Sequence, residues 1–254
     1  MIDLIVFTAG NNHYALDIEN IQRIIQAKEL AEISNAHKLI DGMMSYENKV
    51  IKVLNFRKLI NLSSYEEELK KLFLRFKMEH QNWINELKDS VDNGLSFGKT
   101  TDPHKCELGI WLDSFNSYNE DISAVLKELM QNHTNLHVMG MSVLELSKTD
   151  KEAAQKMLDT DVYHVYNNTV STIDIFMNSL QKVANSLQKL ILYEKDNNYF
   201  AIKVDAIEDI AHIDESTTIN EDEENSISEF LELKGVLDID GVLINIIKTI
   251  NIPK

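Results

Sequence analysis

The apolar positions of the chain follow a two-residue period near both ends and a helical period in the middle. Residues 4–8 and 14–18 are short apolar runs on either side of a Gly-Asn-Asn turn signal at residues 10–12, which predicts a β-hairpin. Residues 21–25 fit a short helix or another strand, because periodicity cannot decide over so few positions. Residues 49–56 alternate apolar with polar side chains and predict a further strand.

The pattern of the first segment returns near the C-terminus. Residues 11–18 (NNHYALDI) are echoed by residues 197–204 (NNYFAIKV), and Gly42 and Gly235 each precede a strand-like run. Recurrence of two elements in the same order predicts two similar small β-subdomains whose sequences are separated by the middle of the chain, although short hairpins can also look alike by chance. We expect Gly42 to mark the turn ahead of its strand, and residues 196–198 to form a turn between two strands.

Between residues 63 and 188 the period becomes helical. Ser64 and Glu67 have the spacing of a capping box, which predicts the start of a helix. Apolar side chains recur at steps of three and four over residues 69–91, 122–144 and 154–187. The last of these stretches has a heptad-like seam and is expected to be one long helix. With a short helix near residues 108–115, the pattern predicts a bundle of about four helices inserted into a β-rich scaffold.

Composition narrows the classes of protein that fit this pattern. The chain has 254 residues, of which 44% are apolar, so it is long enough for one large or two ordinary domains. Its formal net charge of −16 argues against a nucleic-acid binder, which needs basic patches to meet phosphates. We expect no membrane insertion and no signal peptide, because no apolar run approaches roughly 18 residues. The single cysteine cannot form an internal disulfide, which favours a reducing cytoplasm.

That cysteine, Cys106, and three histidines carry the candidate chemistry. His80 lies on the apolar stripe of the first predicted helix, and His133 and His137 lie one turn apart on the second, as a shared metal requires. One thiol and three imidazoles suffice for a tetrahedral Zn²⁺ site. Each residue alone has an ordinary interpretation, as a hydrogen-bonded core histidine or an inert buried thiol. Together, without a metal, they would leave several buried polar groups unpaired, which favours zinc.

Other histidines and other metal chemistry fit less well. His104 is two residues from Cys106 and could compete as a ligand, His164 lies beside the third helix's seam and should be solvated, and the remaining three histidines belong to the β portions. A hemerythrin-like di-iron site would need bridging carboxylates and more histidines. A hydrolytic zinc enzyme would need a general base, but Thr134 and Asn135 stand where such enzymes carry a glutamate. The chain is therefore not expected to be an enzyme.

The candidate ligands lie in three motifs, KMEHQNW at residues 77–83, HKCELGIW at 104–111 and HTNLH at 133–137. Together these motifs resemble the chemoreceptor zinc-binding (CZB) domain family. The family has a His, Cys, His, His site on a four-helix bundle. By resemblance, the zinc ligands of this chain are His80, Cys106, His133 and His137. Trp83 and Trp111 would be packing residues of the same motif.

The two outer segments share a second set of motifs, in residues 7–18, 42–57 and 190–210. These residues resemble the CheW-like domain, the coupling module of bacterial chemotaxis. It implies two SH3-like β-subdomains packed side by side, with the CZB-like helices in the link between them. Arg57 fits the arginine of the family's Asp-Leu-Arg motif, although Asn55 replaces the acid. Residues 46–48 stand where the family usually has Leu-Arg-Gly, so Glu47 reverses a charge that helps such scaffolds engage receptors.

The resulting prediction is a multidomain α and β protein. A CheW-like double SH3-like β-barrel comprises residues 1–63 and 189–254, and a four-helix-bundle CZB domain is inserted over residues 64–188. The resemblance implies a cytoplasmic coupling scaffold that links chemoreceptor tips with a CheA-type histidine kinase, with Arg57 and Glu47 as candidate partner contacts. The zinc-binding insert would respond to zinc or to oxidation of its cysteine. In the alternative, the zinc is structural and the insert is a spacer or a unit that could form a homodimer.

Overall fold

A computed structural model describes residues 2–115, 117, 119–195, 198–214 and 226–253 of the chain. The chain divides into two compact units. The β unit comprises residues 1–67 and 184–254, and the helical unit comprises residues 68–183. The boundaries predicted from the sequence lie a few residues away from this division, and the separation into independent domains stays a prediction.

The described strands form two sheets in the β unit. Sheet A has the order β8 (Ala206–Ile213), β1 (Ile2–Ala9), β2 (Asn12–Asp17), β11 (Val242–Ile250), β10 (Leu231–Ile239) and β9 (Ser226–Ser228). Sheet B has the order β3 (Ile21–Gln26), β6 (Lys189–Lys195), β7 (Asn198–Val204), β5 (Lys49–Asn55) and β4 (Ile40–Tyr46). Neighbouring strands are antiparallel except for β2 with β11 and β5 with β7, which are parallel.

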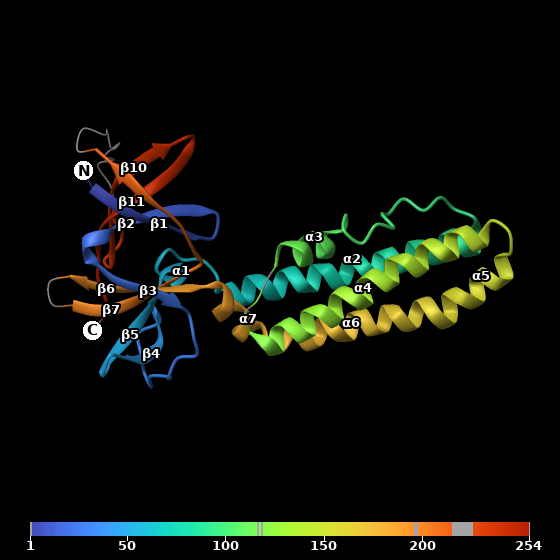
Figure 1. The fold of residues 1–254 in the computed structure, drawn as a ribbon, viewed down its shortest axis with the longest axis horizontal. Helices are drawn as coiled ribbons and strands as arrows, with labels where there is room; N and C mark the ends of the chain where they lie inside the picture. Colours follow the sequence, from blue (N-terminus) through green and yellow to red (C-terminus); the bar gives the residue numbers. More distant parts are fainter. Residues whose placement is uncertain (1, 116, 118, 196–197, 215–225, 254) are drawn as a thin grey trace. The chain divides into compact units, whose positions relative to one another are not determined.

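Each sheet is assembled from both ends of the chain, as the blue, orange and red strands of Figure 1 show. Sheet A adds β8, β10 and β11 to the β1–β2 hairpin, and sheet B adds β3, β4 and β5 to the β6–β7 hairpin. The exchange is reciprocal, because the two parallel pairs occupy equivalent places in the two sheets. The repeat seen in the sequence is therefore confirmed in the strand order, but neither sheet is built from one end of the chain alone.

Gly42 and Gly235 are equivalent positions in the two sheets and share an unusual backbone conformation. Their φ angles are +153° and +152°, and each lies at an irregularity inside a strand, β4 and β10 respectively. The turn expected at Gly42 is therefore wrong, because glycine here bends a strand that continues beyond it. A β-carbon on Gly42 would stand 2.6 Å from the carbonyl oxygen of Ala31, which leaves no room for a side chain.

The two sheets pack on a common apolar core, and sheet B is strongly curved. The packed rings of Phe7, Tyr14 and Phe56 lie in this core with apolar residues of both sheets. The guanidinium carbon of Arg23 on β3 lies 6.0 Å from the ring centre of Tyr46 on β4, although these strands are opposite edges of sheet B. Residues 21–25, whose apolar pattern fits a helix or a strand, lie in strand β3. The two β-subdomains expected from the sequence are present as two sheets, and the strand orders of the described residues do not record a closed barrel.

The helical unit contains most of the helical residues (Figure 1). The helices and helical turns of the chain are η1 (Ile18–Asn20), α1 (Phe56–Leu59), α2 (Tyr65–Asn93), α3 (Glu107–Ser114), α4 (Glu120–Ser147), α5 (Lys151–Met157), the π-helical turn η2 (Leu158–Val162), α6 (Tyr163–Met177) and α7 (Leu180–Leu187). The Tyr166 hydroxyl of α6 donates to Gln81 of α2 at 2.6 Å, and the Asn132 amide of α4 donates to Thr172 of α6 at 3.0 Å. These bonds tie the three long helices together.

The helical periodicity predicts the first two long helices well and the third only in part. The Glu67 N–H donates to the Ser64 hydroxyl at 3.1 Å, so the predicted cap of α2 is present. The single helix expected over residues 154–187 is wrong, because α6 ends at Met177 and α7 begins at Leu180. The apolar seam continues across this break, so its period alone does not reveal where the helical backbone stops.

Two smaller expectations concern the chain's turns and its relation to membranes. The β1–β2 hairpin is present, with Gly10 at φ +61° in its turn. The turn expected at residues 196–198 falls on residues 196 and 197, which lie outside the described ranges.

Among the described residues, the helices lack any stretch that is both long and apolar enough for a bilayer crossing.

We predict that Gly42→Ala destabilises the protein by about 2–3 kcal/mol, because the new side chain combines a disfavoured φ with a backbone clash. The measurement is denaturant unfolding of the full chain followed by far-UV circular dichroism. Gly241→Ala is the matched control, since Gly241 has φ +85° but a β-carbon there would meet no atom within 4 Å. The Gly241→Ala substitution should lower the free energy of unfolding by only about 1 kcal/mol. Equal losses in the two variants would contradict the steric explanation.

Candidate metal centre

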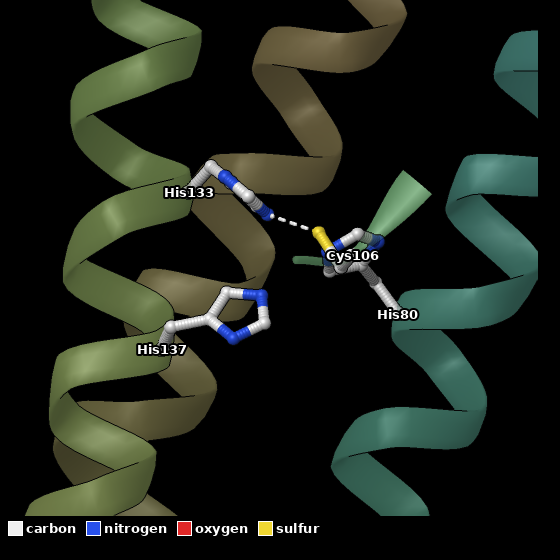
Figure 2. A group of neighbouring side chains, drawn as sticks. All are labelled: His80, Cys106, His133 and His137. Atoms are coloured by element: carbon white, nitrogen blue, oxygen red, sulfur yellow. Dashed lines mark hydrogen bonds between the residues drawn. The ribbon is translucent and has the colours of Figure 1, made fainter. Parts of the chain in front are cut away.

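Four side chains from three elements converge inside the helical unit (Figure 2). His80 projects from α2, and His133 and His137 project from successive turns of α4 toward it. Cys106 is the N-cap residue of α3, at the end of the loop that follows α2. Helical spacing explains the two α4 residues, because positions i and i+4 lie on the same face.

The ligand-type atoms of the four side chains form a compact group. One atom from each lies within 4.8 Å of the others. The Cys106 Sγ is 3.1 Å from His133 Nε2 and 3.9 Å from His80 Nε2. Zinc bonds of about 2.0–2.3 Å in a tetrahedron place ligand atoms roughly 3.3–3.8 Å apart. Small side-chain adjustments would therefore suffice to enclose one ion.

The hydrogen bonds of the histidine rings leave nitrogen atoms available to a metal. His80 Nδ1 lies 2.8 Å from the Phe76 carbonyl oxygen and donates its proton there, so His80 Nε2 keeps a lone pair on the side of Cys106. Neither nitrogen of His137 has a hydrogen-bond partner among the described residues, although this side chain is fully buried. An unpaired buried imidazole is costly, and metal coordination would satisfy it.

Local backbone geometry fixes the position of Cys106. The Gly109 N–H donates to Cys106 Sγ at 3.3 Å, so the sulfur caps the first turn of α3. A β-carbon on Gly109 would lie 1.7 Å from the Pro103 carbonyl oxygen. Only glycine therefore lets the loop ahead of Cys106 approach α3 closely enough to aim the sulfur inward.

Two residues support His137: Gly140, which the sequence analysis missed, and Trp83, which it named as a packing residue of the motif. Gly140 lies one turn beyond it on α4, and a β-carbon there would be 2.2 Å from the Trp83 ring, so Gly140 makes space for that indole. The Trp83 ring centre lies 5.0 Å from that of His137, and its N–H donates to the Thr100 carbonyl at 2.8 Å. Trp83 thus connects His137 with the loop that leads to Cys106. A glycine on the inward face of a long helix was the available signal.

Burial keeps the three imidazoles neutral. It lowers the pKa of His133 to about 2, with further contributions from the nearby His80 and His137. It lowers the pKa of His137 to about 4, helped by His80 and partly offset by the Thr100 backbone and Asp102. The pKa of His80 is also lowered by burial, against the effect of the Phe76 carbonyl. Neutral imidazoles are the form that binds metals.

The thiol behaves differently from the imidazoles. Burial raises the pKa of Cys106 above its ordinary value, and the N–H groups of Gly109 and Leu108 partly oppose this. The metal-free cysteine is therefore protonated at neutral pH and must lose a proton to become a ligand. Three neutral nitrogens and one sulfur, without a carboxylate in the cluster, match the preferences of Zn²⁺. Four protein ligands would close a tetrahedral site.

The histidines outside the cluster all have other surroundings. His104, the possible competitor, is exposed, and its Nδ1 lies 2.9 Å from an Asp113 oxygen. His164 is exposed, as expected. His13 pairs with Glu208, His212 pairs with Asp3, and the His37 ring packs on Phe230.

The two candidate partner contacts differ in exposure. Glu47 is exposed and lies in the positive-φ turn between β4 and β5. The Arg57 side chain is only 2% exposed and forms an ion pair with Asp205 at 2.9 Å. Arg57 thus has an internal partner, and a role of either residue in partner binding stays a prediction.

Comparison with known proteins finds the same two families as the sequence motifs. Residues 3–81 match the family model of the CheW-like domain, and residues 80–144 match that of the chemoreceptor zinc-binding domain. The expected combination of a CheW-like domain with a CZB domain is therefore confirmed.

Individual relatives are distant. The chemotaxis protein CheW of Thermotoga maritima is 19% identical over 72 residues, which are 28% of this chain and 48% of that protein. The chain therefore matches about half the length of this relative. The crystal structure of the scaffolding protein TtCheW from Thermoanaerobacter tengcongensis aligns with a TM-score of 0.45 and 12% identity, over 97% of this chain and 84% of that one.

We predict that the metal-free protein loses stability as the pH falls from about 6.5 toward 4. In this window the unfolded histidines, with an ordinary pKa near 6.5, bind protons that the buried His133 and His137 do not. Each such histidine lowers the free energy of unfolding by about 1.4 kcal/mol for each pH unit in this window. The measurement is denaturant unfolding at several pH values, followed by tryptophan fluorescence, because both tryptophans lie in the helical unit.

The variant His137→Phe isolates the contribution of one ring. It should reduce the pH slope by about 1.4 kcal/mol per unit while leaving the remaining histidines in place. A slope identical to that of the unaltered metal-free protein would contradict the assignment of this pH dependence to the cluster.

Proposed function

We propose that this chain, a CheW-like domain carrying a chemoreceptor zinc-binding domain, is a cytoplasmic chemotaxis coupling scaffold whose helical insert binds Zn²⁺ and responds to it. The partners are chemoreceptor tips and a CheA-type histidine kinase, and the scaffold has no catalytic role of its own. The observation that carries this proposal is the convergence of His80, Cys106, His133 and His137 within the segment that matches the zinc-binding family.

The donor set supports zinc as the metal. When bound, the ion would join α2, α4 and the start of α3 at one point and act as a structural cross-link. His80 and His133 supply nitrogens that already face the Cys106 sulfur, and His137 supplies an unpaired nitrogen beside them. The Cys106 proton leaves on binding, so zinc affinity should rise with pH.

The β unit offers a cleft for a partner. It has a volume of about 280 Å³ and lies between sheet A and the end of β6. Its apolar wall includes Leu4, Leu16 and Ile246, and its rim includes Lys195, Lys234 and Lys248. Asp17 also lines the cleft, and Lys248 forms an ion pair with Glu232 at 2.6 Å, so the positive charge of the rim comes mainly from Lys195 and Lys234. An apolar wall beside these two lysines favours a partner segment that combines apolar and acidic side chains, in a chain whose net charge is −16.

Oxidation of Cys106 gives the site a second input. Hypochlorous acid would convert the Cys106 thiolate of the zinc-loaded site to a sulfenic acid, with transfer of the OH group to sulfur and release of chloride. Sulfur is oxidised by two electrons and chlorine is reduced by two. A sulfenic acid is a poorer zinc ligand than a thiolate, so the ion would lose one of four attachments.

A purely structural zinc is the second candidate. Cluster residues His80, His133 and His137 are buried among the apolar side chains that hold α2 to α4, so a bound ion would also stabilise the bundle. In this case the insert serves as a spacer or as a unit that could form a homodimer. The two candidates differ in the effect of chelation on the helical unit: unfolding indicates structure, and a folded, reloadable unit indicates sensing.

We predict that the purified chain binds one zinc ion and that Cys106→Ala weakens binding at least roughly 100-fold. Loss of a supporting hydrogen bond around a metal typically costs about 10–100-fold, and loss of a ligand should cost at least as much. The measurement is competition with a chromogenic chelator. His104→Ala is the control, because His104 is exposed and paired with Asp113 outside the cluster. Equal weakening by both variants would contradict the assigned ligand set.

We predict that zinc changes the affinity of the chain for the regulatory domain of the chemotaxis kinase by about 5–150-fold, the usual range of allosteric coupling. Isothermal titration of the zinc-loaded and chelated protein measures it. Treatment with hypochlorite should shift the loaded protein toward the chelated value, and Cys106→Ala should abolish both responses. An affinity independent of zinc and oxidant would reject the sensory function and leave the structural candidate.

A further inference from the structure

A buried polar cluster in the β unit joins the two segments that lead to and from the helical unit. Its centre is the carboxylate of Asp205, which is 8% exposed. Asp205 Oδ2 accepts hydrogen bonds from Arg57 Nη1 at 2.9 Å and from the Gly10 N–H at 2.8 Å. Asp205 Oδ1 accepts from the Gln188 side-chain amide at 3.2 Å. We call these four residues the Asp205 cluster.

The outgoing segment is held through Arg57. The Arg57 Nε donates to the Ser63 carbonyl at 3.0 Å, and its guanidinium carbon lies 5.1 Å from the ring centre of Tyr65, the first residue of α2. A β-carbon on Gly10 would stand 2.8 Å from a methyl group of Leu62, so the outgoing segment also lies close to the β1–β2 turn. The start of the long helix is thereby attached to the cluster at several atoms.

The returning segment is held through Gln188. This residue directly precedes β6 and its side chain is 2% exposed. Its carbonyl oxygen accepts from the Ala27 N–H at 3.1 Å and from the Gln26 side-chain amide at 2.7 Å. Gln188 therefore fixes the end of the returning chain to Asp205 on one side and to the end of β3 on the other.

Asp205 also connects the two sheets. It stands between β7 of sheet B and β8 of sheet A, and its own N–H donates to the Thr8 carbonyl of β1 at 3.0 Å. Because its carboxylate is buried and paired with Arg57, the loss of a donor weakens the compensation of its charge. The carboxylate must consequently follow its donors when they move, and the β1–β2 turn must follow the carboxylate.

We propose that the Asp205 cluster is the coupling element of the scaffold: a change in the helical unit that displaces the returning segment at Gln188 is passed through Asp205 to the Gly10 turn of sheet A. The coupling rests on the proposed function for its input, the binding of zinc. Its output is the position of the strands that border the cleft in the β unit, since β1 carries Leu4 of that cleft.

Hydrogen exchange of the full chain with and without one equivalent of zinc tests the coupling. The reporters are the amides of Gly10, which donates to Asp205, and of Asp205 itself. We expect at least a threefold zinc-dependent change in their exchange rates. Gln188→Met, which keeps the side-chain volume and removes the amide donor, should reduce this ratio to near one. Its zinc affinity, measured by chelator competition, should stay within twofold of the unaltered chain.

Asn245→Leu is the matched control. This substitution also removes one side-chain amide hydrogen bond of the β unit, from Asn245 to the His13 carbonyl at 3.0 Å, but it touches neither segment leading to the helices. This variant should keep the zinc-dependent ratio at Gly10. The proposal is overturned if Gln188→Met keeps the full ratio, or if the unaltered chain shows none.

The affinity of the unaltered chain for the kinase domain separates this inference from the proposed function. If that affinity depends on zinc and Gln188→Met leaves the dependence unchanged, the coupling route is wrong and the sensory function stands. If the amides of Gly10 and Asp205 respond to zinc through Gln188 while kinase affinity does not, the coupling stands and the sensory function falls.

Discussion

Two parallel strand pairs, β2 with β11 and β5 with β7, hold the two ends of the chain in common sheets, and the rest of the architecture depends on them. Parallel neighbours cannot be joined by a tight turn and need a long connection. Between β5 and β7 that connection contains the whole helical unit and β6. Because the entropic cost of closing a loop grows slowly with its length, a long insertion at this place is tolerated while the pair keeps its register. The helical unit therefore occupies a connection that the β architecture requires anyway.

The metal centre uses the rigidity of the helical unit in a similar way. His80, His133 and His137 stand on helices of 28 or 29 residues, and apolar side chains of these helices pack around them. Packing around the rings orients them, but it does not satisfy their polar nitrogens. The unpaired nitrogens of His137 show where the packing leaves a polar group unsatisfied.

Sequence patterns predict those features of this protein that depend on neighbours along the chain. The capping of α2 by Ser64, the inward faces of α2 and α4 and the spacing of His133 with His137 all follow from local periodicity. The exchange of strands between the sheets does not, because both hairpins have the same local pattern whichever sheet they join. The irregularity at Gly42 is likewise set by the approach of Ala31, which is close in space through a loop of no clear period. The fit of Trp83 against Gly140 could not be predicted either, because each role depends on the other across two helices.

The placement of Cys106 bears on whether bound zinc would have a sensory or a structural role. The three histidines are at most 2% exposed and lie on long packed helices, whereas the cysteine is only partly buried, at the start of the eight-residue α3. The apolar cluster around Trp83, Leu136 and Leu158 joins α2, α4 and the η2 turn without any contribution from Cys106. Release of the sulfur would therefore leave this packing of α2 with α4 in place. A site whose most oxidisable ligand is also its most accessible one is suited to a reversible change of state.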